Sequence, residues 1–312
     1  MGVLKTLFFE GSEKKFELVV RQGHPSLRQF GAQWKQVVAS AGAHVLSVIA
    51  NDDCDAYLLS ESSLFVYDHR VIMITCGQTT LIRAVQHVFS FIKLQDVELF
   101  IYERKNEQLP EDQPTDFEAD VALLNKLMPG EAYFFGDPDG HHIRLYHMLS
   151  TYKPHPRDTT LEILMHGLSP DDSRVFYAQD DVDAATVGQK SGLTSVFDGF
   201  ETDGFVFEPY GYSLNAIRND LYYTVHVTPQ PHCSYASFET NFYLEGDITN
   251  LVDKVLDIFR PEHCLVMLFE REDGSCLLRQ CESVSHRVEH SLSCGYRVQF
   301  ASVRSGLRLS RR

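Results

Sequence analysis

Three short apolar runs within residues 57–76 decide the fold class of this chain. The stretch reads YLLSESSLFVYDHRVIMITC, and its runs cover Tyr57–Ser60, Ser63–Tyr67 and Val71–Thr75. Short apolar runs separated by polar turn residues are typical of consecutive β-strands. The stretch therefore predicts neighbouring strands joined by tight turns, with no helix between them.

The same pattern extends to both sides of this stretch. Further strands are predicted at Lys15–Val20, Glu98–Tyr102, His142–Leu149, Thr160–Leu164, Gly204–Phe207, Tyr222–Thr228, Ser234–Glu239, Cys264–Phe269 and Tyr296–Ala301. Apolar residues at helical spacing predict helices at Pro25–Ala41, Thr79–Leu94, Phe117–Met128 and Ile248–Phe259. Because the strands come in groups with helices between the groups, we expect an α+β fold with antiparallel sheets.

The remaining segments are predicted to be irregular. Lys105–Asp116 and Ser169–Ser173 are polar and are expected to be surface loops, and the basic tail 304–312 is expected to be disordered. A weak echo links Ser60–Cys76 with Tyr210–His226, since each stretch has a serine early and a reactive side chain at its end. The echo indicates either a duplicated half that gives two facing sheets or chance similarity between β-hairpins.

The composition excludes several classes of protein. The 312 residues contain 28 Lys and Arg against 43 Asp and Glu, a formal net charge of -15. Such a balance argues against binding to nucleic acid or to an anionic membrane, and it would attract a cationic substrate, although solubility alone also explains it. Seven cysteines without a C-x-x-C motif indicate reduced thiols, a cytoplasmic location and no metal site.

Several residues could carry chemistry, and each also has a plain structural explanation. The Ser-Glu-Ser-Ser run at 60–63 is either a solvated turn or a strained, reactive serine. Cys76 is either a small buried apolar residue or a thiol whose pKa is lowered by the helix that follows it. His226 is either a core histidine or a catalytic base. Glu10 and Glu13 suit a cationic organic ligand, but a turn around Gly11 also explains them.

Sequence motifs for nucleotide-binding loops, zinc proteases and serine hydrolases are absent from the chain. The segments FFEGSEKKFELVV, LSESSLFV, ITCG, TLEILM, GYSLNAI, YTVHVTP and CSYASFETN, in this order, resemble the eukaryotic-type S-adenosylmethionine decarboxylase proenzymes. The resemblance runs from Phe9 to at least Phe269. It implies one domain over residues 1–312, built as a four-layer αββα sandwich, and it raises the catalytic interpretation of His226 above the structural one.

The resemblance implies that the chain makes its own cofactor. Ser62 would attack the carbonyl of Glu61, and the chain would separate into residues 1–61 (β chain) and 62–312 (α chain), with a covalent pyruvoyl group formed from Ser62. Ser213 would stabilise the tetrahedral intermediate of this step, and His226 would remove the α-proton of Ser62. In the decarboxylation of S-adenosylmethionine, which leads to spermidine and spermine, Cys76 would be the proton donor. No metal is implied.

The resemblance also assigns the binding residues. Phe9 and Phe207 would sandwich the adenine, and Glu10 and Glu13 would serve binding, processing and activity. Gln230 departs from the family, which typically has a glutamate there for the ribose hydroxyls. Tyr210 is a second departure, because a cysteine is common before the GYS motif. The glutamine leaves open a pyruvoyl-dependent decarboxylase of another amino acid, such as ornithine or arginine. A third alternative is a non-catalytic paralogue that activates a partner.

A diamine site is the last implied feature. In animal members an acidic cluster binds putrescine, and the aligned residues here are Glu17, Asp158, Thr160, Glu162 and Glu239. The lysine expected two positions before the catalytic cysteine is Ile74, whereas Lys15 and Arg104 align with basic positions of members that need no diamine. We therefore expect these two cations to neutralise the cluster, and putrescine to stimulate weakly or not at all. Monomers and homodimers both occur in the family.

Overall fold

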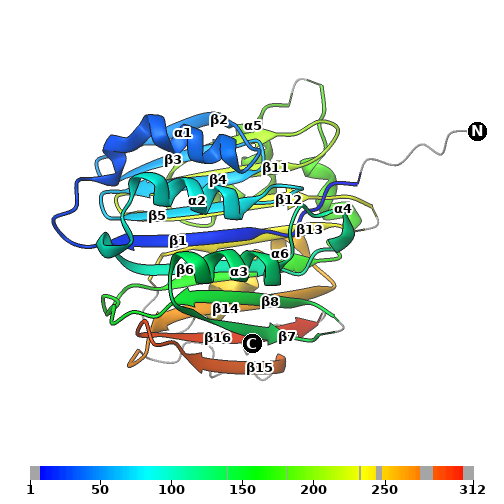
Figure 1. Ribbon diagram of the computed structural model, residues 1–312. Helices are drawn as coiled ribbons and strands as arrows, with labels where there is room; N and C mark the ends of the chain where they lie inside the picture. Colours follow the sequence, from blue (N-terminus) through cyan, green and yellow to red (C-terminus); the bar gives the residue numbers. More distant parts are fainter. Residues whose placement is uncertain are drawn as a thin grey trace, which may run out of the picture.

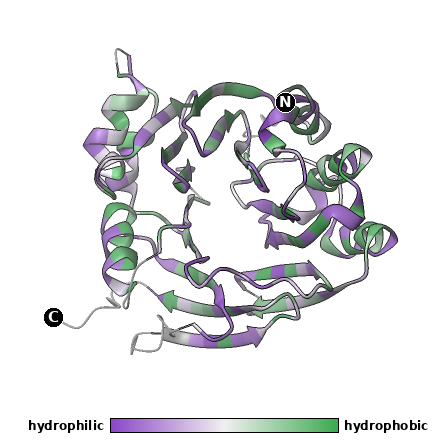
Figure 2. Ribbon diagram, turned by 90° about the vertical axis from the view of Figure 1, so that its left-hand side faces the viewer, coloured by the Kyte–Doolittle hydropathy of each residue, from purple (hydrophilic) through white to green (hydrophobic). Residues whose placement is uncertain are grey.

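The computed structural model of the chain describes residues 8–138, 140–180, 182–231, 233–243, 248–274 and 284–304. Two antiparallel eight-stranded sheets face each other, and helices cover their outer faces (Figure 1, Figure 2). The predicted α+β sandwich of four layers is confirmed. The basic tail lies, apart from Arg304, outside the described residues.

The first sheet, sheet A, is built by the first half of the chain in the order β2-β3-β4-β5-β1-β6-β8-β7. Its strands are β1 (Lys14–Val20), β2 (Val45–Ala50), β3 (Cys54–Leu59), β4 (Ser62–Tyr67), β5 (Arg70–Thr75), β6 (Val97–Lys105), β7 (Gly130–Gly136) and β8 (His142–Met148). The stretch quoted first, residues 57–76, thus forms β4, β5 and the second half of β3. The two turn residues between β3 and β4 are Ser60 and Glu61.

The second sheet, sheet B, is built by the second half in the order β10-β11-β12-β13-β9-β14-β16-β15. Its strands are β9 (Thr160–His166), β10 (Glu201–Val206), β11 (Tyr212–Arg218), β12 (Leu221–Thr228), β13 (Tyr235–Thr240), β14 (His263–Arg271), β15 (Val284–Ser291) and β16 (Tyr296–Arg304). Renumbered from its own first strand, this order is identical to that of sheet A, so the chain is a structural duplication. The similarity between Ser60–Cys76 and Tyr210–His226 was shifted by one strand from this duplication. The first stretch contains β4 and β5, which correspond to β12 and β13, whereas the second contains β11 and β12.

The helices form the two outer layers. They are α1 (Gly31–Ser40, preceded by the short helix η1 at Leu27–Phe30), α2 (Leu81–Phe91), α3 (Phe117–Leu127), α4 (Pro170–Ser173), α5 (Ala184–Ser191) and α6 (Thr249–Phe259). One apolar core lies between sheet A and α1, α2 and α3, and a second lies between sheet B and α5 and α6. The segment Ser169–Ser173, predicted to be a loop, contains α4. None of the helices in the described part of the chain is long and apolar enough to cross a bilayer.

Strand β1 shows how the sequence positions charge between the sheets. Its residues alternate, so that Phe16 and Leu18 pack into the core beneath the helices, whereas Lys15 and Glu17 point toward sheet B. Two smaller apolar clusters fill other parts of the layer between the sheets. The charged side chains of β1 therefore lie in a water-poor interior, where each of them needs a partner.

Candidate active site

A cavity of about 330 Å³ contains most of the predicted catalytic and substrate-binding residues. Its wall includes the cleavage pair Glu61 and Ser62 and the predicted catalytic and substrate-binding residues Phe9, Cys76, Phe207, Ser213, His226 and Gln230. The residues come from both halves of the chain, so the cavity exists only because the two sheets face each other. Tyr210, the second departure from the family pattern, also lies in its wall.

The backbone at Ser62 is strained. Ser62 begins β4, directly after the turn formed by Ser60 and Glu61, and its φ is 115°, a value that few residues other than glycine adopt. Such a conformation costs about 1–3 kcal/mol and persists only where its surroundings impose it. Here the carbonyl oxygen of Glu61 accepts a hydrogen bond of 3.1 Å from the backbone N–H of Cys76, which holds the peptide in place. The Ser62 side chain is buried as well.

Gly77 lets the surrounding segments approach this peptide closely. Its φ is +65°, and a Cβ atom there would lie 2.8 Å from the carboxylate of Glu61 and 3.1 Å from the ring of Phe9. Its N–H also donates to the carbonyl oxygen of Glu10 at 2.8 Å. A side chain at position 77 would therefore push both Glu61 and Phe9 out of place.

The Cys76 thiol is protonated at neutral pH. Burial, and next the neighbouring carboxylates of Glu61 and Glu13, raise the pKa of Cys76 well above its usual value. One of the two interpretations of Cys76 from the sequence predicted a lowered pKa, because a helix follows the cysteine. That helix begins only at Leu81, and the loss of hydration outweighs its dipole. The thiol can therefore hold and deliver a proton, but it is a poor nucleophile.

His226 is held between two groups of hydroxyls. Its Nδ1 lies 2.9 Å from the Ser213 hydroxyl, and its Nε2 lies 3.0 Å from the hydroxyl of Thr224 and 3.2 Å from that of Ser63. Burial lowers the pKa of His226 to about 3, so the imidazole is neutral and can accept a proton. The amide oxygen of Asn215 accepts from Ser63 at 2.6 Å and from Thr224 at 2.9 Å.

Ser63, Asn215 and Thr224 are the site residues that sequence reasoning missed. Ser63 lies in the quoted SESS run and the other two lie within the GYSLNAI and YTVHVTP segments, so polar residues inside predicted or actual strands were the available signal. Which of them meet depends on how one sheet faces the other, and the sequence pattern does not contain that information.

Two predicted site residues do not line the cavity. The carboxylate of Glu10 instead accepts hydrogen bonds from the backbone N–H groups of Ser12, Gln108 and Leu109, and it faces a second cavity. Glu13 accepts a 2.6 Å hydrogen bond from Ser237 in sheet B. Burial raises the pKa of Glu13 to about 8, an effect that the Ser237 hydrogen bond only partly offsets.

The predicted acidic cluster does gather between the sheets, around cations of the chain itself. Lys15 Nζ lies 2.8 Å from Glu162 and 3.0 Å from Glu239, and Tyr222 donates a further hydrogen bond to Glu239. The surrounding carboxylates raise the pKa of Lys15 well above its usual value despite the opposing effect of burial. Thr160 begins the same strand as Glu162 and is buried.

Two further cations of the cluster were not predicted. Lys105 Nζ lies 2.9 Å from Glu103 and 2.5 Å from Glu162. Arg70 lies 3.1 Å from Glu17 and 2.5 Å from Asp158. Lys105 was assigned to a surface loop, but it is the last residue of β6 and is buried.

Arg104 was expected in this cluster, and that expectation is wrong. Its guanidinium pairs with Glu107 at 2.5 Å and with Asp120 of α3 at 2.7 Å, on the helix side of sheet A. Side chains alternate along β6, so neighbouring residues 104 and 105 point to opposite faces. Lys105 therefore takes the place that the sequence assigned to Arg104.

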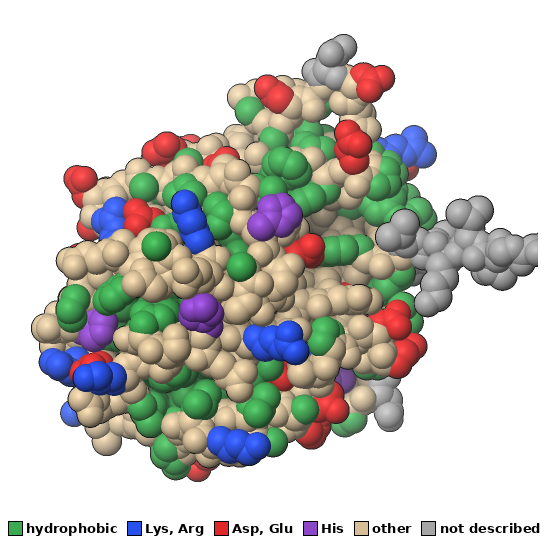
Figure 3. Space-filling view, turned by 45° about the horizontal axis from the view of Figure 1, so that its top comes forward, with side chains coloured by type: hydrophobic (Ala, Val, Ile, Leu, Met, Phe, Trp, Pro, Cys, Tyr) green, Lys and Arg blue, Asp and Glu red, His purple; other side chains and the backbone are tan. Residues whose placement is uncertain are grey.

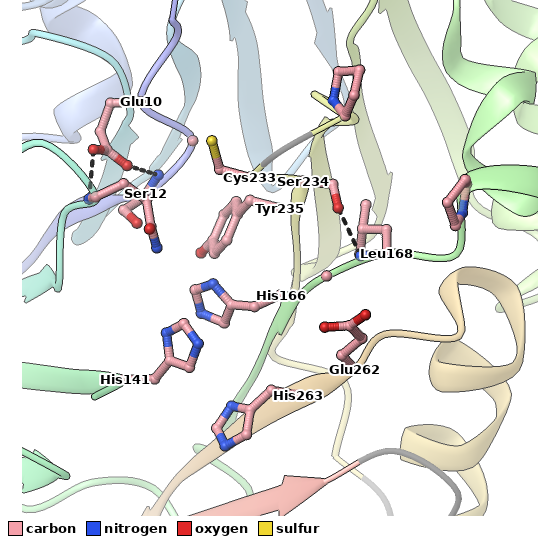
Figure 4. Close-up of a pocket in the computed structure, with 15 residues that line it drawn as sticks. Glu10, Ser12, His141, His166, Leu168, Cys233, Ser234, Tyr235, Glu262 and His263 are labelled. Atoms are coloured by element: carbon pink, nitrogen blue, oxygen red, sulfur yellow. Dashed lines mark hydrogen bonds between the residues drawn. The ribbon is translucent and has the colours of Figure 1, made fainter. Parts of the chain in front are cut away.

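A second cavity of about 330 Å³ is lined in part by Glu10, Gly11 and Ser12, and Figure 4 shows its lining. His141, from the turn between β7 and β8, stacks on His166 of β9 with ring centroids 3.7 Å apart, and its ring lies 4.8 Å from that of His263 of β14. These imidazoles connect the edge of sheet A with the centre of sheet B. Among the described residues, no three His, Cys, Asp or Glu side chains are grouped as metal ligands would be.

The outer surface adds no single-sign patch on the face drawn in Figure 3. Acidic and basic side chains are interspersed there with apolar and uncharged ones, in the part of that face that the structure describes. Part of the excess of carboxylates lies inside the molecule instead, in the cluster around Lys15, Lys105 and Arg70.

Comparison with known proteins agrees with this geometry. Residues 6–305 match the family model of adenosylmethionine decarboxylase. The S-adenosylmethionine decarboxylase proenzyme of Dictyostelium discoideum is 35% identical over 291 residues, which cover 86% of this chain and 76% of the relative. That of Xenopus laevis is 34% identical over 299 residues, covering 90% and 88%. A crystal structure of a Trypanosoma brucei AdoMetDC monomer superposes with a TM-score of 0.60 at 28% identity, covering 78% of this chain and 98% of that one. The chain belongs to the adenosylmethionine decarboxylase family.

Proposed function

We propose that this chain cleaves itself between Glu61 and Ser62 and then decarboxylates S-adenosylmethionine with a pyruvoyl group derived from Ser62. The observation that carries the proposal is the strained Ser62 peptide, which shares one cavity with Ser213, His226 and Cys76. A serine supplies both a nucleophilic oxygen and a leaving group on its β-carbon, as this chemistry requires.

The cleavage uses groups of the chain alone. The Ser62 oxygen bonds to the Glu61 carbonyl carbon, the C–N bond breaks, and the proton of the hydroxyl passes to the nitrogen, which leaves an ester and a free amine. Ser213, at the cavity wall, is placed to stabilise the oxyanion of this step. Neutral His226 then accepts the α-proton of Ser62, and the main-chain carboxylate of Glu61 leaves the β-carbon of Ser62. The resulting dehydroalanine takes up water and releases ammonia, which leaves a ketone at the new N-terminus.

The cavity suits the proposed substrate. The rings of Phe9 and Phe207 lie in its wall and can bind an adenine between them and attract a sulfonium, a contact worth about 0.5–2 kcal/mol. The pyruvoyl group supplies an electron sink for the carbon that loses CO2. Cys76, protonated at neutral pH, is placed to return a proton to that carbon. A reducing, cytoplasmic location would preserve this thiol.

The charged cluster supports independence from diamines. Lys15, Lys105 and Arg70 already pair with the carboxylates that a diamine would bind. We therefore propose that putrescine stimulates neither cleavage nor catalysis appreciably. A several-fold increase in either rate on adding putrescine would contradict this part of the proposal.

The decisive experiment combines a denaturing gel, intact mass and CO2 release. The purified chain should give two fragments, the larger one blocked at its N-terminus, and should release CO2 from S-adenosylmethionine but not from ornithine or arginine. Ser62→Ala should stay uncut and inactive. A parent chain that remains at 35.6 kDa would refute self-cleavage, and a cut chain that prefers ornithine or arginine would refute the substrate.

A further inference from the structure

The hydrogen bonds around His226 determine which of its ring nitrogens carries the proton. The amide oxygen of Asn215 accepts the hydroxyl protons of both Ser63 and Thr224. Each hydroxyl has one proton, so both oxygens are left with lone pairs only. Nε2 of His226, at 3.0 and 3.2 Å from these oxygens, can therefore only donate to them.

A neutral imidazole carries one proton, so Nδ1 must then be the unprotonated nitrogen, whose lone pair can accept a proton. Nδ1 accepts from the Ser213 hydroxyl at 2.9 Å. Ser213 and His226 line the cavity that contains Ser62, whereas Ser63, Thr224 and Asn215 do not. The basic nitrogen thus lies toward the reacting bond, and the N–H points into the protein interior.

We infer that Asn215 is a positioning residue that fixes His226 in the Nε2–H tautomer through Ser63 and Thr224. Without the amide oxygen, the two hydroxyls could turn and donate to Nε2, which would move the proton to Nδ1. His226 would then present an N–H to the cavity and could not accept the α-proton of Ser62. Loss of a tautomer-fixing carboxylate in a serine protease triad costs about 10⁴ in rate, so the effect is large when the base is essential.

The position of Ser63 gives this device a further property. Ser63 is the second residue after the scissile bond, and it reaches across from β4 of sheet A to residues of β11 and β12 in sheet B. The tautomer of the base is therefore tied to correct seating of the strand that begins with Ser62. The inference rests on the proposed function in one respect only, the role of His226 as the base.

The tautomer itself can be measured without any reaction. The full-length Ser62→Ala chain, labelled with 15N-histidine, gives two-bond 1H–15N correlations in which a bare nitrogen and a protonated one differ clearly. Comparison with a Ser62→Ala chain that also carries His226→Gln assigns the signals of His226. We expect Nδ1 to be the bare nitrogen. In Asn215→Leu the population of His226 with an unprotonated Nε2 should increase, whereas Asn215→Asp should keep the tautomer of the parent.

Asn215→Asp is the matched control because it keeps the acceptor oxygen and loses only Nδ2, which has no hydrogen-bond partner among the described residues. At this fully buried position the carboxyl group is expected to be protonated and to mimic the amide. In the chain that retains Ser62, Asn215→Leu should slow self-cleavage at least about tenfold, and Asn215→Asp should stay within about threefold of the parent. If Asn215→Leu does not fold, Ser63→Ala combined with Thr224→Val removes the same relay.

Two results would overturn the inference. A bare Nε2 in the Ser62→Ala chain would show that the proton lies on the other nitrogen. A folded Asn215→Leu chain that cleaves at the parent rate would show that Asn215 does not position the base. If instead the parent chain never cleaves, the proposed function is wrong. The tautomer of His226 can still be measured in the Ser62→Ala chain, because that measurement does not depend on cleavage.

Discussion

At the scale of single residues, the protonated thiol of Cys76 separates cleavage from catalysis. In the proposed mechanism the thiol returns a proton after CO2 leaves, and the cleavage scheme does not use it. Cys76→Ala should therefore still cut itself, while kcat for CO2 release falls by about 10²–10⁴. Fragment masses and a CO2 assay on the same sample measure both effects. An equal loss of both activities would instead indicate that Cys76 supports the cleavage site.

Gln230 is the second residue with a measurable consequence. It is 5% exposed and lines the cavity where the family typically has a glutamate. A carboxylate would form stronger hydrogen bonds to ribose hydroxyls, so Gln230→Glu should lower KM for S-adenosylmethionine by about 5–30-fold, or about 1–2 kcal/mol. The exposed Gln36→Glu carries the same charge change and should leave KM unaltered. An unchanged KM in Gln230→Glu would mean that residue 230 does not contact the ribose.

Residue-level prediction from the sequence named residues that lie together where a motif carried it, and it missed the contacts where the two sheets meet. Ser62, Cys76, Ser213 and His226 were all named, and they share one cavity. The Asn215 network was missed, because contacts between two sheets leave no periodic signal in either strand. The choice of Arg104 over Lys105 was wrong for a simpler reason, since a shift of one residue along a strand moves a side chain to the opposite face.

At the scale of elements, strand β1 separates two buried lysines onto its two faces. Lys15 pairs with Glu162 and Glu239 between the sheets, while Lys14 donates to the Gly77 carbonyl and to Gln113 on the helix side. Lys15→Met leaves the buried Glu239 without a cation among the described residues and Glu162 with Lys105 alone, which should lower the free energy of unfolding by about 3–5 kcal/mol. Thermal unfolding with and without putrescine measures the loss and its rescue.

The control for this experiment is Lys14→Met, on the same strand. It should also destabilise the fold, since Lys14 makes two hydrogen bonds, but it leaves no carboxylate cluster open. We expect putrescine to raise the Tm of Lys15→Met only. Equal responses in both variants, or none in Lys15→Met, would show that the cluster has no room for a diamine even without its lysine.

The elements themselves were largely predictable from the sequence. The four predicted helices lie where the apolar spacing placed them, as α1 with η1, α2, α3 and α6. The predicted strands leave out β2, β7, β11 and β15. Strand β7 begins and ends with glycine, and β11 carries Ser213 and Asn215 on an inward face, which weakens the pattern of both. Helix α5 was missed because its eight residues include Gly188 and few apolar side chains. Polar or glycine-rich elements give weak patterns even when tertiary contacts stabilise them.

At the scale of the whole molecule, cleavage should not separate the two fragments. Strand β1 belongs to the smaller fragment, yet it lies between β5 and β6 of the larger one, and β3 pairs with β4 across the cut. Loss of the smaller fragment would expose the edges of β4, β5 and β6 and part of the core of sheet A. We therefore expect both fragments to elute together in size-exclusion chromatography and to separate only in denaturant. Elution of the larger fragment alone in native buffer would contradict this arrangement.

The stacked histidines should make the contact between the sheets sensitive to acid. Burial, followed by the charges of His263 and His142, lowers the pKa of His141 from 6.5 to about 4, and burial first also lowers the pKa values of His166 and His263. A histidine with a lowered pKa contributes stability that is complete above pH 6.5 and is lost as the pH falls toward 4. Because His141 is partly exposed, solvent screening reduces its contribution to the free energy of unfolding to about 1–2 kcal/mol.

His141→Phe tests this pH dependence, because it keeps a stacking ring that cannot titrate. Denaturant unfolding at pH 7 and at pH 4.5 should show a smaller loss of stability in the variant than in the parent. The other groups around the stack are Tyr235, which packs on His166, and Glu262 and Arg304, which line the neighbouring cavities. An identical loss in both chains would assign the acid sensitivity to those groups or to the carboxylate cluster.

The identical strand order of the two sheets has an evolutionary consequence. Consecutive halves with one topology are what duplication and fusion of a gene leave behind, and we infer such an origin from the strand orders. The two halves, however, contribute different residues to the cavity: Ser62 and Cys76 come from the first half, and Ser213 and His226 come from the second. In the proposed self-cleavage, the first half therefore supplies the bond that is cut, and the second supplies the groups that assist the cut.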